Sequence, residues 1–217
     1  TRLVSDWSSD VCSSDLLKEV LEFFDWSPFF WSWELKGQYP SIFERSDSGS
    51  EAKDLFDNAQ VLLNRILKED LFTCEAVVGI WPANSSTDDV VLYEDLEKQN
   101  EVGRFHFVRR QQSLLDQPQF CLSDFVAPID SNRTDYLGAF AVCAGSGVDL
   151  LAQEFEEDND DYNAIMTKAL GDRFAEAMAE YTHKKVREWW GFGKTENLSN
   201  SELIKEKYQG IRPASGY

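Results

Sequence analysis

Apolar residues recur at helical spacing in three stretches of the chain. The run from Leu17 to Phe24 predicts a short helix that leads into Asp25. A 3.6-residue period predicts an amphipathic helix over 51–67 and a longer helix that begins after Asp158 or Asp160 and ends at Trp189-Trp190-Gly191. Both tryptophans are expected to pack beneath the end of the long helix. The predicted buried stripes are Leu55, Ala59, Leu62, Leu63 and Ile66 in the helix over 51–67, and Tyr162, Ile165, Met166, Ala169, Leu170, Phe174, Ala177, Met178 and Tyr181 in the long helix.

Short apolar runs lie between these two helices. Strands are predicted over 76–81, ending in a turn at Pro82-Ala83-Asn84, over 90–93 and over 104–108. The run from Tyr136 to Ala144 is apolar and unbroken, which predicts a central strand covered on both faces. Strands in the middle of the chain, with helices before and after them, indicate an α+β domain.

The segment 1–16 shows neither a helical nor an alternating period, and it repeats Ser-Ser-Asp. It resembles the translation of a sequencing adapter; the alternative is a native acidic tail. We therefore treat 1–16 as a non-native tail that adds nothing to the core, and 17–217 as the domain.

Composition limits the classes of partner. The chain has 217 residues and a net charge of −18, from 39 acidic and 21 basic residues, which argues against a nucleic acid or an anionic membrane surface as the partner. The acidic excess suits either solubility or attraction of a basic protein. The four cysteines (Cys12, Cys74, Cys121 and Cys143) and two histidines form no metal-ligand spacing, so we expect reduced thiols, no bound metal and a cytoplasmic location.

Two positions carry candidate binding chemistry. Asp25 stands among aromatic residues, where its carboxylate either receives a ligand's ammonium group or caps the helix that follows. Arg212 precedes Pro213 and is close to Tyr217, and a guanidinium beside a rigid turn suits a carboxylate or phosphate, although a plain surface turn has the same composition. Neither His106 nor His183 has the neighbours in sequence that a nucleophile would need, and no catalytic residue is predicted.

Several ordered blocks resemble the activation domain of cobalamin-dependent methionine synthase. The longest runs from Glu196 to Tyr217 and contains the Arg-Pro and Gly-Tyr pairs. The other blocks are 25–30 (DWSPFF), 33–37 with 39–40 (WELKG, YP), 78–84 (VGIWPAN), 121–128 (CLSDFVAP), 135–142 (DYLGAFAV) and 160–166 (DDYNAIM).

The resemblance implies one α+β domain with a central antiparallel sheet and flanking helices. It also implies a site for S-adenosylmethionine in which Arg212 binds the methionyl carboxylate, Asp25 contacts the ligand, and Tyr217 and Ala214 lie beside it. The family domain continues past the Arg-Pro motif, so we expect a C-terminally incomplete domain that is inactive alone.

The same resemblance implies a part of a methyltransferase of methionine biosynthesis. In that family, S-adenosylmethionine remethylates cob(II)alamin held by another domain of the same polypeptide, and a flavodoxin-type protein donates an electron. Cobalamin and zinc belong to the full protein only. The alternatives are a carbohydrate-binding or hydrolytic domain, suggested by the aromatic start, and an interaction module that uses its acidic face.

The tail hypothesis gives a direct test. Deleting residues 1–16 should leave the thermal midpoint unchanged, because a segment outside the core adds nothing to the free energy of unfolding. A fall of several degrees, equivalent to roughly 1 kcal/mol, would show that the segment is native structure.

Overall fold

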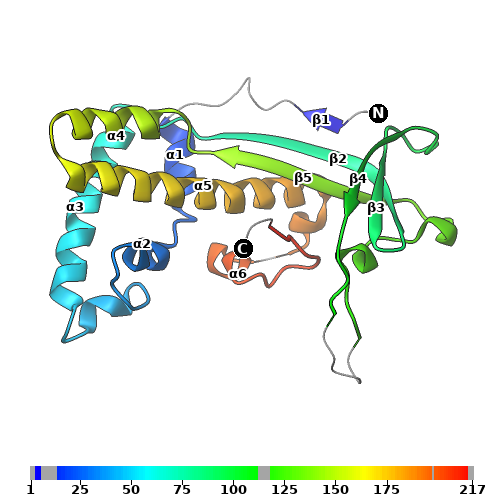
Figure 1. The fold of residues 1–217 in the computed structure, drawn as a ribbon, viewed down its shortest axis with the longest axis horizontal. Coiled ribbons are helices and arrows are strands. Elements are labelled where there is room, and N and C mark those ends of the chain that lie inside the picture. The colour runs from blue at the N-terminus through cyan, green and yellow to red at the C-terminus, as the bar shows by residue number, and fades with distance from the viewer. Residues whose placement is uncertain (1–2, 6–13, 112–117, 197, 215–217) are drawn as a thin grey trace. The chain divides into compact units, whose positions relative to one another are not determined.

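The computed structural model describes residues 3–5, 14–111, 118–196 and 198–214 (Figure 1). They form two compact units. One contains residues 3–5 and 77–140, and the other contains residues 14–76 and 141–214. The α+β class predicted from the sequence is confirmed, with the strands mainly in the first unit and the helices in the second.

The first unit is a five-stranded sheet. Its order is β1-β2-β3-β4, with β5 also paired to β2, and the ladders β1–β2, β2–β3 and β3–β4 are antiparallel. In register, Ala83 faces Leu92 and Val90 faces Phe105. The strands span Leu3–Ser5 (β1), Glu75–Ser86 (β2), Asp89–Tyr93 (β3), Glu101–His106 (β4) and Asp135–Cys143 (β5), and the short 3-10 turns Leu122–Phe125 (η3) and Ile129–Ser131 (η4) precede β5.

Two strand predictions are wrong in detail. Strand β2 does not end at Pro82 but continues to Ser86. Pro82 lies between residues 78–80, which pair with β1, and residues 83–86, which pair with β3, so its missing N–H interrupts neither ladder. Strand β5 is not covered on both faces: half-buried and exposed residues largely alternate along it, and Tyr136 is 39% exposed.

The N-terminal segment also departs from the expectation. Leu3–Ser5 pairs with residues 78–80 of β2, and helix α1 already begins at Ser14. Leu16, in the first turn of α1, is half-buried and packs against the core, so the expectation that 1–16 adds nothing to the core is wrong at this residue. Residues 1–2 and 6–13 lie outside the described residues. Whether the segment is a non-native tail stays a prediction, and the deletion above tests it.

The second unit is built from helices packed on one long helix. Helices α1, α3 and α5 confirm the three predicted helices, α2 is the helix that the capping interpretation of Asp25 requires, and α4 was not predicted. The bounds are Ser14–Leu21 (α1), Trp26–Ser32 (α2), Gly49–Lys68 (α3), Gly147–Glu157 (α4), Asp161–Trp190 (α5) and Asn200–Ile204 (α6), with 3-10 turns Ser41–Glu44 (η2) and Phe192–Lys194 (η5).

Helix α5 begins and ends as its sequence predicts. The Asp160 side chain accepts a hydrogen bond from the Asn163 backbone N–H at 3.1 Å, while Asp158 instead terminates α4. At the other end, Gly191 adopts a left-handed φ of 107°, which a residue with a Cβ disfavours.

The buried face of α5 differs from the predicted stripe at its start. Met166, Leu170 and Phe174 are fully buried, but Tyr162 and Ile165 are 40% and 55% exposed. Helix α4 packs closely on α5 at a residue outside the apolar stripe: a Cβ at Gly171 would lie 2.7 Å from Val148 Cγ1. An apolar period does not register such a position.

The prediction for the tryptophans at the end of α5 is also wrong. Trp189 and Trp190, the last two residues of α5, are 45% and 40% exposed.

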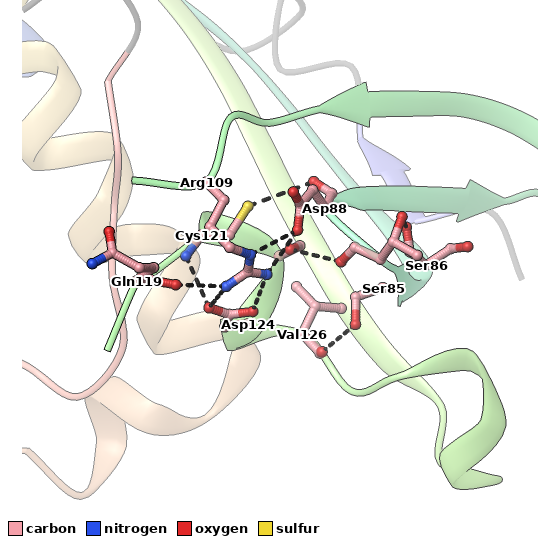
Figure 2. A network of polar contacts seen from close by, with 10 residues as sticks. Ser85, Ser86, Asp88, Arg109, Gln119, Cys121, Asp124 and Val126 are labelled. Atoms are coloured by element: carbon pink, nitrogen blue, oxygen red, sulfur yellow. Dashed lines mark hydrogen bonds and ion pairs between the residues drawn. The ribbon is translucent and has the colours of Figure 1, made fainter. Parts of the chain in front are cut away.

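A polar network joins residues 119–126 to Arg109 and to the β2–β3 turn (Figure 2). The Arg109 guanidinium donates to both Asp88 and Asp124 at 2.8 Å and to the Gln119 carbonyl at 2.7 Å. Arg109 holds the pKa of Asp124 at about 2, well below its usual range. The Ser85 hydroxyl donates to the Val126 carbonyl at 2.9 Å. The block 121–128 therefore has a structural role here.

Asn84 is the buried centre of the same region, with no exposed surface. Its amide donates to the carbonyls of Ala127 and Arg133, both at 2.9 Å, and its carbonyl oxygen accepts from Lys98 Nζ at 2.5 Å. One side chain thus joins β2 to two loops that are distant in sequence.

We expect Asn84→Ala to destabilise the protein by about 1–3 kcal/mol, because it removes three hydrogen bonds made by a side chain with no exposed surface. Urea denaturation would measure the change in the free energy of unfolding. The control is Asn100→Ala, whose exposed amide makes one 3.4 Å contact with Glu94. Equal effects of the two substitutions would contradict the role given to Asn84.

Candidate functional site

Arg212 forms an ion pair with Glu180 of α5. Its Nη2 donates to Glu180 Oε1, and the two side chains are only 22% and 16% exposed. Burial lowers the pKa of Arg212, but the charge and hydrogen bonds of Glu180 and Tyr208 outweigh it and leave the pKa raised. Burial raises the pKa of Glu180, and Arg212 offsets only part of that effect. Arg212 therefore stays a cation beside a carboxylate that is poorly solvated.

The pair leaves one donor and one acceptor unused. Among the described residues, Arg212 Nε and Glu180 Oε2 are buried and have no hydrogen-bond partner. An unpartnered buried polar atom costs about 1–3 kcal/mol. A bound group that accepts from Arg212 and donates to Glu180 would remove that cost, and an α-amino acid, with its carboxylate and ammonium on one carbon, is such a group.

The Glu180 side chain belongs to a polar stripe on α5. Glu180, His183 and Arg187 stand at i, i+3 and i+7, which places them on one face of the helix. That face meets the segment that follows α6, with Glu180 against Arg212, His183 against Tyr208, and Arg187 against Gln209.

His183 lies inside this polar layer. Its ring meets the Tyr208 ring edge to face at 4.7 Å. Burial first, and then the positive charges of Arg212 and Arg187, lower the pKa of His183 to about 4, with Glu196 acting weakly in the other direction. The imidazole is therefore neutral at physiological pH.

Arg187 and Glu196 close the layer at its far end. Arg187 is 7% exposed, and its guanidinium pairs with the Glu196 carboxylate and donates to the Gln209 carbonyl at 2.8 Å. The Gln209 N–H donates to Glu196 Oε1 at 3.1 Å. Hydrogen bonds from Arg187 are the main reason that the pKa of Glu196 is lowered.

Asp25 is an N-cap. Its Oδ1 accepts from the Ser27 N–H at 2.9 Å at the start of α2, and the residue is exposed. The capping interpretation is thereby confirmed, while contact with a ligand stays a prediction. Within the described ranges, Asp25 and Arg212 share no hydrogen bond or ion pair, so the structure does not join the two predicted ligand residues directly.

The remaining predicted positions are less defined. Ala214 is exposed in irregular chain, and Tyr217 lies outside the described residues. His106 lies in the other unit, where Nδ1 is 3.0 Å from Asp89 Oδ1. In the part of the chain that the structure covers, no group of histidine, cysteine and acidic residues could hold a metal, and no helix is long and apolar enough to cross a membrane.

Most of the aromatic residues around Asp25 are buried or half-buried, and Trp31, at 53%, is the exposed one. Phe23, Phe29 and Phe30 are at most 4% exposed and belong to the core. Trp26 packs edge to face on Phe56 at 4.8 Å. The sequence feature that suggested carbohydrate binding is therefore used mainly for packing.

The sequence analysis missed Glu180 and Arg187 and found no role for His183. The available signal was a polar stripe at i, i+3 and i+7 on a helix whose preceding turns are apolar. Such a stripe also occurs on any solvated helix face, so the pattern alone does not single it out.

His183 gives a pH prediction. An ordinary histidine takes up its proton near pH 6.5 and the buried one near pH 4, so in this interval the unfolded chain binds more protons and stability falls as the pH falls from 6.5 towards 4. His183→Gln should lose less stability over that interval than the unsubstituted protein, as measured by urea denaturation at several pH values. His106→Gln controls for loss of an imidazole as such, and parallel profiles for all three proteins would contradict the prediction.

Comparison with known proteins gives the family. Residues 16–217 match the family described as "Vitamin B12 dependent methionine synthase, activation domain". A solved structure titled "Crystal Structure of the MetH Reactivation Domain bound to AdoHcy" is 46% identical in sequence, with a TM-score of 0.88 over 93% of this chain. The match spans 62% of that solved chain. The chain belongs to the family of activation domains of vitamin B12-dependent methionine synthase.

Proposed function

We propose that this domain binds S-adenosylmethionine and its product S-adenosylhomocysteine, and that Arg212 receives the carboxylate of the amino-acid end. The observation that carries the proposal is that, among the described residues, the Arg212–Glu180 ion pair leaves a buried donor, Arg212 Nε, and a buried acceptor, Glu180 Oε2, without a hydrogen-bond partner. The 46% identical reactivation domain was solved with AdoHcy, which supports a ligand of this class.

Two carboxylates compete for the ammonium group in this proposal. Glu180 already touches Arg212, so it meets the requirement that the carboxylate and ammonium of one α-carbon be bound side by side. Asp25 is the residue that the family resemblance favours; its Oδ1 is engaged in the helix cap. We assign the ammonium to Glu180 and keep Asp25, with Ala214 and Tyr217, as further proposed contacts of the ligand.

The domain's residues bind and orient in this proposal, and none acts as an acid or base. When bound, S-adenosylmethionine supplies a sulfonium methyl group for transfer to cobalamin held by another domain of the full protein. A fixed grip on the amino-acid end limits the directions in which that methyl group can point. The electron from a flavodoxin-type donor, the zinc of the full protein and a cytoplasmic location belong to the same proposal.

Calorimetric titration of the full-length protein with S-adenosylhomocysteine tests whether Arg212 binds the ligand carboxylate. Arg212→Ala should weaken binding roughly ten- to a hundredfold, because a charge-assisted hydrogen bond contributes about 1.5–3 kcal/mol. Arg212→Lys should also lose affinity, since an ammonium cannot reproduce the planar fork. Arg45→Ala, which removes an exposed ion pair with Asp47, is the matched control.

Two further variants assign the ammonium. Glu180→Gln and Asp25→Asn each remove one negative charge, and asparagine keeps the helix cap. A loss of affinity with Glu180→Gln alone supports the assignment above, and a loss with Asp25→Asn alone reverses it. Unchanged affinity in a folded Arg212→Ala protein would refute the proposed site.

A further inference from the structure

The backbone of Gln209, which lies three residues before Arg212, is held on both sides by charged side chains. Its N–H donates to Glu196 Oε1 at 3.1 Å, and its carbonyl accepts from Arg187 Nη1 at 2.8 Å. Arg187 and Glu196 also pair with each other through Nε and Nη2. The Arg187–Glu196 ion pair is therefore hydrogen-bonded to both the N–H and the carbonyl of Gln209.

This ion pair is more buried than stability alone would favour. The Arg187 and Glu196 side chains are 8% and 19% exposed. Apolar side chains of similar volume are often as stabilising as a buried ion pair, since burying charges carries a large desolvation cost. The charged pair fixes the orientation of the Gln209 backbone, because a guanidinium donates only to the carbonyl and a carboxylate accepts only from the N–H.

The two hydrogen bonds at Gln209 are also the nearest hydrogen bonds of the backbone to Arg212. Among the described residues, no backbone group from 210 to 214 takes part in a backbone–backbone hydrogen bond. Gly210 turns the chain through a left-handed φ of 101°. The neighbouring Tyr208 is 8% exposed, its ring lies 4.8 Å from the Arg187 guanidinium, and Tyr208 contributes to raising the pKa of Arg212. Apart from its own ion pair with Glu180, Arg212 is therefore positioned through residues 208 and 209.

We infer that Arg187 and Glu196 are positioning residues for ligand binding: by fixing Gln209 they set where the Arg212 guanidinium meets the ligand carboxylate. This inference rests on the proposed function. Neither residue touches the ligand in this scheme, so their effect should be limited to ligands that possess the group Arg212 binds.

The test uses two probes that differ in that group. S-adenosylhomocysteine has the amino-acid end, and 5′-methylthioadenosine lacks it. In the full-length protein, Glu196→Ala should weaken binding of S-adenosylhomocysteine about tenfold, as expected for one displaced charge-assisted hydrogen bond, and leave binding of 5′-methylthioadenosine unchanged. Arg65→Ala removes another Arg–Glu pair of the same unit, with Glu154 at 2.8 Å, and should change neither affinity.

A double-mutant cycle separates positioning from general damage. In an Arg212→Ala background, adding Glu196→Ala should cost no further affinity, because the residue acts through Arg212. Glu196→Gln keeps an acceptor for the Gln209 N–H and should recover part of the loss. It also serves as the test variant if Glu196→Ala does not fold, with a smaller loss expected for S-adenosylhomocysteine alone.

Each outcome has a separate meaning. The positioning role is overturned if folded Glu196 variants bind both probes equally more weakly, or if they bind S-adenosylhomocysteine as tightly as the unsubstituted protein does. In either case the proposed function stands as long as Arg212→Ala weakens binding of S-adenosylhomocysteine. If Arg212→Ala itself binds normally, the proposed function fails and the positioning role fails with it.

Discussion

Helix α5 must bury an apolar face along its first half and present charged side chains along its last three turns. The apolar half, including Leu170 and Phe174, is the surface on which the neighbouring helices pack. The polar half holds the segment after α6. Because both halves belong to one continuous helix, the packing of the core determines the direction in which Glu180 and Arg187 project. The candidate site is therefore fixed by the core rather than by its own loops.

The polar half is stable because its charges are balanced in pairs. Two guanidinium groups, Arg187 and Arg212, are matched by Glu196 and Glu180, and His183 between them stays neutral. Each carboxylate is placed to offset the desolvation of one arginine, as buried charges require. The pairs are not equivalent: the one at Arg187 also binds a backbone residue, whereas the one at Arg212 keeps an unused donor and acceptor.

The sequence predicts the elements whose period is long and unmixed, and it fails where the environment changes along one element. Helices α3 and α5 were predicted because their apolar stripes persist over many turns. Pro82 was misread because a strand that changes partner tolerates a proline, and an apolar pattern does not show the partners. Arg212 was found through its motif, whereas Glu180 looks like any solvated helix residue until residues 205–214 fold over it. Trp189 and Trp190 were expected to be buried because they are large aromatic residues, but the sequence does not show which surfaces cover the end of a helix.

The hydrogen bonds from Arg187 and Glu196 to Gln209 limit where chimeras of related domains can be joined. The segment from Glu196 to Arg212 is shaped by Arg187, which lies on the preceding helix and would usually fall on the other side of a loop boundary. A chimera joined at Gly191 would separate the two halves of the ion pair whenever the parents differ at either position. The workable junction lies upstream of Glu180, so that the end of α5 and the Arg-Pro segment are inherited as one piece.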